Sequence, residues 1–166
     1  MKTIKLFVST VVMSIIMVGS VAAQDYFFKK QAPFNTNIPS PEVFLGYPIG
    51  AQHTRHDQIV SYLYKLAELS DRATIKVYGK THEQRKLVML TVSTPANLKN
   101  LSTLKSNHLK FVDPSQHPNN YAAVPIFIQL GYNVHGNEPS SSEAAMLTAY
   151  TLVASTSSEV KNYIEN

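Results

Sequence analysis

Residues 124–139 read Val-Pro-Ile-Phe-Ile-Gln-Leu-Gly-Tyr-Asn-Val-His-Gly-Asn-Glu-Pro and join an apolar run, a turn and the start of a helix. The nearly continuous apolar run of residues 124–130 predicts a strand that is buried on both faces. Residues 131–137 predict a turn, and Pro139 suits the first position of a helix. That helix, expected over residues 139–155, is apolar on most sides and should be well buried.

A second amphipathic helix is expected from about His56 onward. Its apolar residues recur at three- and four-residue steps, at Ile59, Tyr62, Leu63, Leu66 and Leu69. Thr54 is the expected N-cap, and Asp57 is its acidic partner three residues later.

A hairpin and a third helix separate these two helices. Residues 73–79 and 86–93 predict two strands joined by a loop. Residues 95–111 predict a helix that follows a proline. This order of elements predicts an α/β fold, namely the N-terminal portion of a three-layer α/β/α domain with a mixed sheet. The sheet should be incomplete, because a central strand at residues 124–130 needs neighbours on both edges.

The composition limits the possible functions. The 166 residues are 44% hydrophobic and 16% charged, which argues against intrinsic disorder. There is no cysteine, so a metal site must use His, Asp or Glu. Because no basic cluster occurs beyond Lys29-Lys30, we expect no nucleic-acid partner.

The N-terminus resembles a secretory signal peptide. Lys2 and Lys5 precede a short apolar stretch, and small residues continue to Ala23, where we expect cleavage. Without the two lysines, 13 basic residues remain against 11 acidic ones. The cleaved chain should be secreted or periplasmic, without stable membrane insertion; the alternative is an uncleaved anchor, for which the apolar stretch is short.

The rest of the chain divides at about residue 50. Residues 24–50 are rich in proline and aromatic residues, and should form a lead-in segment along the surface of the domain. Proline should block helix formation in this segment. The domain itself is expected over residues 51–166.

His135 and Glu138 are the strongest candidates for chemistry. They follow the expected strand, at the end of an α/β sheet where ligands bind. Two intervening residues let both side chains turn toward one point, and Gly136 gives the backbone freedom to do so. Imidazole nitrogen and carboxylate oxygen are both good zinc donors. The alternative is that Glu138 caps the next helix and His135 is an ordinary loop residue.

The order of several motifs resembles a known family. Residues 53–155 look like the N-terminal part of the catalytic domain of an M14-type zinc carboxypeptidase, of the carboxypeptidase A-like family. The matching segments are His53-Thr54 with the helix after it, residues 79–85 (Gly-Lys-Thr-His-Glu-Gln-Arg), residues 135–138 (His-Gly-Asn-Glu) and the serine-rich residues 140–143. The second of these resembles the family's Gly-x-Ser/Thr-x-Glu-Gly-Arg turn, with Gln84 where the family usually has glycine.

The resemblance implies a zinc-dependent peptidase that acts on the C-termini of peptides or proteins. His135 and Glu138 match the family's zinc ligands, with a later histidine as the third. Arg85 matches an arginine that contacts the substrate near the zinc. A distant glutamate acts as the general base, and further arginines hold the substrate carboxylate.

Several of these groups have no match after Glu138. No histidine and no arginine occurs there, and Glu159 and Glu165 lie too close to be the distant glutamate. We therefore expect an N-terminal piece of a longer enzyme, which by itself binds zinc weakly and lacks peptidase activity.

Other interpretations stay open. A non-catalytic secreted binding module could retain part of this fold, and a different zinc hydrolase could complete its site across a dimer interface. A related amidase that acts on cell-wall peptides would use the same zinc motif. His53 and His56 could form a second metal cluster, although a polar helix start is the favoured interpretation.

Overall fold

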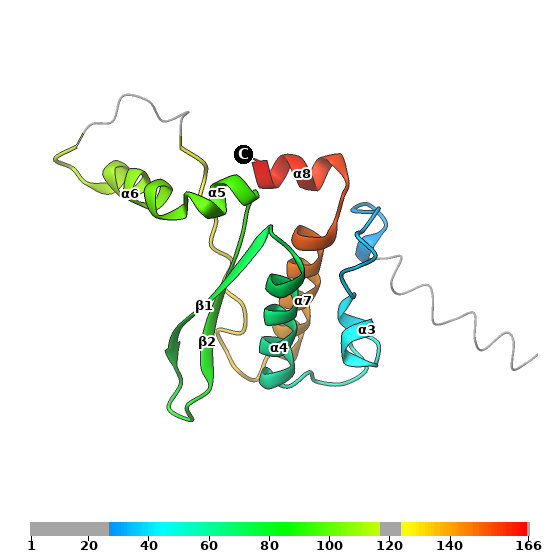
Figure 1. Ribbon diagram of the computed structural model, residues 1–166. Helices are drawn as coiled ribbons and strands as arrows, with labels where there is room; N and C mark the ends of the chain where they lie inside the picture. The colour runs from blue at the N-terminus through cyan, green and yellow to red at the C-terminus, as the bar shows by residue number, and fades with distance from the viewer. Residues whose placement is uncertain (1–26, 117–123, 166) are drawn as a thin grey trace, which may run out of the picture.

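The computed structural model describes residues 27–116 and 124–165. The expected signal peptide, residues 1–23, lies outside them. In chain order, the elements are α3 (Pro41–Leu45), α4 (His56–Leu69), β1 (Ala73–Lys80), β2 (Lys86–Val92), α5 (Pro95–Lys99), α6 (Leu101–Val112), α7 (Pro139–Ala154) and α8 (Ser158–Glu165). They form a small, partial α/β unit, which confirms the expected fold class (Figure 1).

The expected hairpin is confirmed. β1 and β2 pair antiparallel, with Ala73 opposite Val92 and Val77 opposite Val88, and the register shifts between Val77 and Gly79. β-branched residues favour this extended pairing. Two backbone hydrogen bonds close the turn, from Thr81 N to the Arg85 carbonyl (2.9 Å) and from Gln84 N to the Thr81 carbonyl (2.9 Å).

The core lies between α4 and α7, which pack against each other beside the hairpin (Figure 1). Tyr62 and Leu66 of α4 meet Met146 and Val153 of α7, and all four side chains are almost fully buried. Ile59, Tyr62 and Leu66 recur at helical spacing, so one face of α4 supplies the contact, as its sequence predicts.

Aromatic residues hold the lead-in segment against this core. The rings of Phe34 and Tyr150 stack with centroids 4.9 Å apart, and Phe28 packs edge-on against both. The Asn35 N–H donates to the Ala154 carbonyl (2.8 Å), so the segment is also tied to the end of α7. The expectation that proline blocks helix formation here was wrong at α3, because Pro41 occupies a first-turn position, where no N–H is needed.

The expected strand at residues 124–130 does not form. This segment has no regular secondary structure and makes no ladder, and Ile126 and Ile128 are 77% and 78% exposed. A strand acquires its hydrogen bonds from a neighbour, and within the described part of the chain β1 and β2 pair with each other. Pro125 further removes a backbone donor. The apolar run therefore correctly indicates residues that would gain from burial, but no strand among the described residues pairs with them.

Two helix boundaries also differ from expectation. The helix expected over residues 95–111 is divided at Asn100 into α5 and α6, with Thr94 capping α5 through its side chain. The N-cap of α4 is Arg55 instead of Thr54. Thr54 is buried, and its hydroxyl donates to Glu143 of α7, so it is not available to cap its own helix.

Within the described residues, no helix is long and apolar enough to cross a membrane.

Candidate metal centre

His135 and Glu138 meet on a tight turn immediately before α7. The Glu138 N–H donates to the His135 carbonyl (3.1 Å), which closes the turn. The His135 Nδ1 atom lies 3.0 Å from Glu138 Oε1. The two side chains are 72% and 55% exposed, so their donor atoms are accessible from solvent.

Two residues that precede this turn are hydrogen-bonded to α7. The Asn133 N–H donates to Ser141 Oγ (2.6 Å), and the Tyr132 hydroxyl donates to Thr148 Oγ1 (2.9 Å). Asn133 adopts a left-handed backbone conformation with a φ of 57°. Asparagine tolerates this region better than most residues, so it reverses the chain at modest cost.

The expected role of Gly136 was wrong. Its φ is not positive, and a Cβ added there would meet no heavy atom within 4 Å. The left-handed residue of this turn is Asn133, so the conformational freedom that the turn needs is supplied two residues before His135.

The position of Glu138 distinguishes a helix cap from a ligand. Glu138 is the N-cap residue of α7, yet its side chain makes no capping hydrogen bond and faces His135 instead. Pro139 occupies the first turn of α7 and needs no N–H acceptor. The alternative in which Glu138 merely caps α7 therefore lacks its defining contact.

The donor set fits part of a zinc site. One imidazole nitrogen and one carboxylate oxygen converge, and both are ligands that zinc prefers. A catalytic zinc requires three protein ligands. Among the described residues, no group of three or more His, Cys, Asp or Glu could hold a metal ion. The pair could thus supply two of the required ligands.

Arg85 lies at the end of the hairpin turn, just before β2. Its Nε atom lies 2.7 Å from Glu83 Oε2, and both side chains are largely exposed. Gln84, where the resemblance places glycine, has a φ of 64°. The structure therefore pairs His135 with Glu138, whereas Arg85 is paired with Glu83 and contacts neither of them through the described polar interactions.

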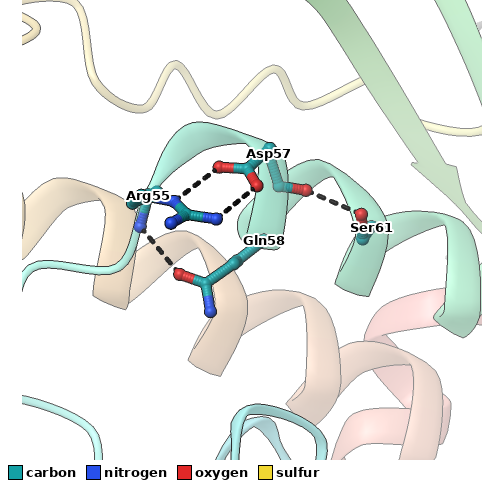
Figure 2. A network of polar contacts seen from close by, with 4 residues as sticks. All are labelled: Arg55, Asp57, Gln58 and Ser61. Carbon is teal, nitrogen blue, oxygen red and sulfur yellow. Dashed lines mark hydrogen bonds and ion pairs between the residues drawn. The ribbon is translucent and has the colours of Figure 1, made fainter.

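A compact polar network begins α4 (Figure 2). Arg55 donates to both carboxylate oxygens of Asp57, at 3.0 and 2.8 Å, and Gln58 Oε1 accepts from the Arg55 main chain (3.4 Å). The hydrogen bond and charge of Asp57 raise the pKa of Arg55, and the hydrogen bond from Arg55 lowers the pKa of Asp57. This network anchors the first turn of the helix.

The structure favours the polar helix start over a His53–His56 metal cluster. His56 Nε2 lies 3.0 Å from the Lys86 carbonyl, which can only accept, so this nitrogen donates. His53 is exposed, and no third ligand joins the two within the described residues.

Sequence reasoning missed one buried polar contact, between Thr54 and Glu143. Glu143 Oε1 accepts from the Thr54 hydroxyl (2.7 Å) and the Thr54 N–H (3.2 Å), and both residues are buried. The sequence feature that could have predicted this contact is Glu143 itself, because its carboxylate lies beside three apolar residues, 144–146, in a helix expected to be buried. A charge in such a place requires a partner.

Comparison with known proteins assigns the chain to a family. No curated protein and no solved structure significantly matches the chain. A family model described as zinc carboxypeptidase, Peptidase_M14, matches residues 59–166, which is more than half of the chain and includes both His135 and Glu138. On this evidence, the chain belongs to the zinc carboxypeptidase family.

Proposed function

We propose that this protein contributes to a zinc metallocarboxypeptidase, which hydrolyses C-terminal peptide bonds of peptides or proteins. The observation that carries the proposal is the 3.0 Å approach of His135 Nδ1 to Glu138 Oε1 on the turn before α7. Membership of the zinc carboxypeptidase family supports it.

His135 and Glu138 would hold the metal. When bound, zinc lowers the pKa of a bound water toward neutrality and polarises a carbonyl group. In the contact between the two residues, a proton on His135 Nδ1 points at the carboxylate. For Nδ1 to become a ligand, the neutral imidazole must carry its single ring proton on Nε2 instead of Nδ1. The chain therefore has to exchange one hydrogen bond for two bonds to the metal.

Arg85 would bind the substrate. A planar guanidinium can donate two parallel hydrogen bonds to a carboxylate or polarise a carbonyl oxygen. Its current partner, Glu83, must be released for this to happen. Because both side chains are exposed, their ion pair contributes about 0–1 kcal/mol, and the exchange costs little.

The 166-residue chain by itself should bind zinc weakly and lack peptidase activity. It brings two ligands together, and a catalytic zinc site requires a third. We further propose that residues 1–23 direct secretion or export to the periplasm, that residues 24–50 form the lead-in segment, and that residues 51–166 form the N-terminal part of the catalytic domain. The apolar and small residues of the first segment support the assignment of a signal peptide.

Calorimetric titration of the 166-residue chain with zinc tests the ligand assignment. We expect weak one-to-one binding that His135→Ala and Glu138→Gln each abolish. The matched controls are His53→Ala and Glu68→Gln, which remove an exposed imidazole and an exposed carboxylate elsewhere and should leave binding unchanged. Binding that persists equally in the His135 and Glu138 variants would place the metal at another site and overturn the assignment.

A further inference from the structure

The hairpin turn and the start of α7 are connected through one short segment, residues 54–56, which we call the connecting segment. The turn that carries Arg85, the start of α4 and the start of α7 all lie at the same end of the molecule (Figure 1). Two side-chain contacts join them, one from each end of the connecting segment.

The first contact joins α4 to the hairpin. His56 Nε2 donates to the carbonyl of Lys86, the residue directly after Arg85 (3.0 Å). This contact lies at Lys86, the first residue of β2, whose Nζ also lies over the ring of Tyr64 in α4, 5.4 Å from the ring centroid. Because the hydrogen bond from His56 is accepted by the main chain of the residue after Arg85, it restrains the backbone there directly.

The second contact joins the same segment to α7. Thr54 donates to Glu143 Oε1 through both its hydroxyl (2.7 Å) and its N–H (3.2 Å). The Tyr47 hydroxyl donates to Thr54 Oγ1 (3.1 Å), and the Gly50 N–H donates to Glu143 Oε2 (3.4 Å). Glu143 is buried, so loss of the hydrogen bonds from Thr54 would leave its carboxylate without those partners in an apolar environment. This cost makes the contact hard to break.

Glu143 lies near the start of α7, whose first residue directly follows Glu138. A contact that fixes Glu143 therefore fixes the first turns of α7 and the His135–Glu138 turn before them. The chain of contacts runs from Arg85 through Lys86, His56, Thr54 and Glu143 to Glu138.

We propose that His56, Thr54 and Glu143 are positioning residues that set the placement of Arg85 relative to the His135–Glu138 pair. The inference rests on the proposed function for its catalytic meaning, whereas the geometric claim stands on the contacts alone. Preorganisation of this kind matters because small displacements of a substrate-binding group cost rate steeply.

The absence of native cysteine makes a direct distance measurement practical. Spin labels at His82→Cys, in the hairpin turn, and Asn137→Cys, beside the metal ligands, report the relative placement of the two elements. Both positions are exposed, and neither is a proposed ligand. Dipolar electron-spin resonance on the doubly labelled chain should give one narrow distance distribution.

We expect His56→Ala to replace that narrow distribution with a broad one, while His56→Gln, whose amide nitrogen can replace Nε2 as the donor, restores it. Thr54→Val breaks the second contact at nearly constant volume, and Thr54→Ser should restore it. Ser61→Ala is the matched control, because Ser61 bonds within α4 to the Asp57 carbonyl (2.7 Å). Far-UV circular dichroism checks that each variant folds.

An unchanged narrow distribution in both His56→Ala and Thr54→Val would overturn the proposal, and core packing alone would then place the turn. The measurement uses neither zinc nor activity. If the distance distribution broadens in these variants but the parent chain binds no zinc, the positioning role of the connecting segment stands and the assignment of His135 and Glu138 as metal ligands fails. If the parent chain binds zinc but the distance distribution is unchanged in the variants, the ligand assignment stands and the positioning role fails.

Discussion

The His135–Glu138 contact depends on local backbone geometry more than on burial. Both side chains are exposed, so their approach follows from the closed turn and from the left-handed conformation of Asn133. The Glu138 side chain makes no capping hydrogen bond to α7. Its negative charge is nevertheless favourable at the N-terminus of a helix. The spacing His-x-x-Glu was therefore informative because a turn, and not a helix, spans it.

Substitution of Gly136 tests where this turn needs freedom. Since the φ of Gly136 is not positive and its Cβ position is open, we expect Gly136→Ala to raise the free energy of unfolding by about 0.4–1 kcal/mol, through a less flexible unfolded chain. Gly46→Ala is the matched control, because Gly46 has a φ of 79° at the end of α3. It should lower that free energy by about 1–2 kcal/mol. Urea denaturation measures both, and equal destabilisation would contradict our account of the turn.

Among the elements, the hairpin turn contains the clearest departure from the family pattern. Gln84 replaces the usual glycine of the resemblance, and the structure retains the left-handed conformation that glycine favours, with a φ of 64°. The backbone bonds of Thr81 with Gln84 and Arg85 maintain this turn. Gln84 therefore adopts a conformation that costs it more than it would cost glycine.

Gln84→Gly should therefore relieve strain. A left-handed conformation costs an ordinary residue about 1–2 kcal/mol, and the added flexibility of glycine costs about 0.5–1 kcal/mol. We expect the free energy of unfolding to stay constant or rise by up to about 1.5 kcal/mol. His82→Gly, in the same turn but without a positive φ, should lower it. Urea denaturation of the two variants compares them, and a larger loss at Gln84 would show that its conformation is not strained.

At the scale of the whole molecule, the described residues share a core between α4, α7, the lead-in segment and the hairpin. Tyr62 is at its centre, fully buried, with its hydroxyl donating to the Pro39 carbonyl (3.0 Å). Burial, with a smaller contribution from Tyr150, raises the pKa of the Tyr62 phenol well above its usual range. The folded state therefore keeps Tyr62 neutral under conditions in which the unfolded chain would ionise it.

This shift predicts loss of stability in alkali. A folded pKa that is raised contributes stability that is complete below the unfolded pKa of about 10 and is lost as the pH rises above it. Tyr62→Phe should lower the free energy of unfolding near pH 7 by about 0.5–1.5 kcal/mol, through the lost hydrogen bond to Pro39. The variant should also lose less stability than the parent chain above pH 10. Urea denaturation from pH 7 to 11 provides the comparison, and parallel curves would argue against Tyr62 as the group responsible.

The apolar segment of residues 124–130 shows how far the core extends. Ile126 and Ile128 are exposed, although the sequence of their segment is typical of a buried strand. The hydrophobic side chains of a segment show that its burial would be favourable, but they do not show which other segment would cover it. The sheet of the described residues ends at the hairpin, and this segment remains outside it.

Local patterns in the sequence were sufficient for the elements whose stability is local. The helical spacing of Ile59, Tyr62 and Leu66 determined α4 and its buried face, and Pro139 determined where α7 begins. Alternating residues and a polar turn determined the hairpin. The spacing of His135 and Glu138 identified the candidate ligands, because side chains at i and i+3 on a turn can approach each other.

Tertiary structure decided the features that depend on distant partners. Thr54 does not cap α4, because its hydroxyl donates to Glu143, which lies 89 residues away in sequence. The apolar run at residues 124–130 remained without a ladder, because strand hydrogen bonds come from a neighbouring chain segment and not from the strand itself. Contacts within a few residues can be predicted from spacing and propensity, whereas non-local pairing depends on which segments the fold brings together.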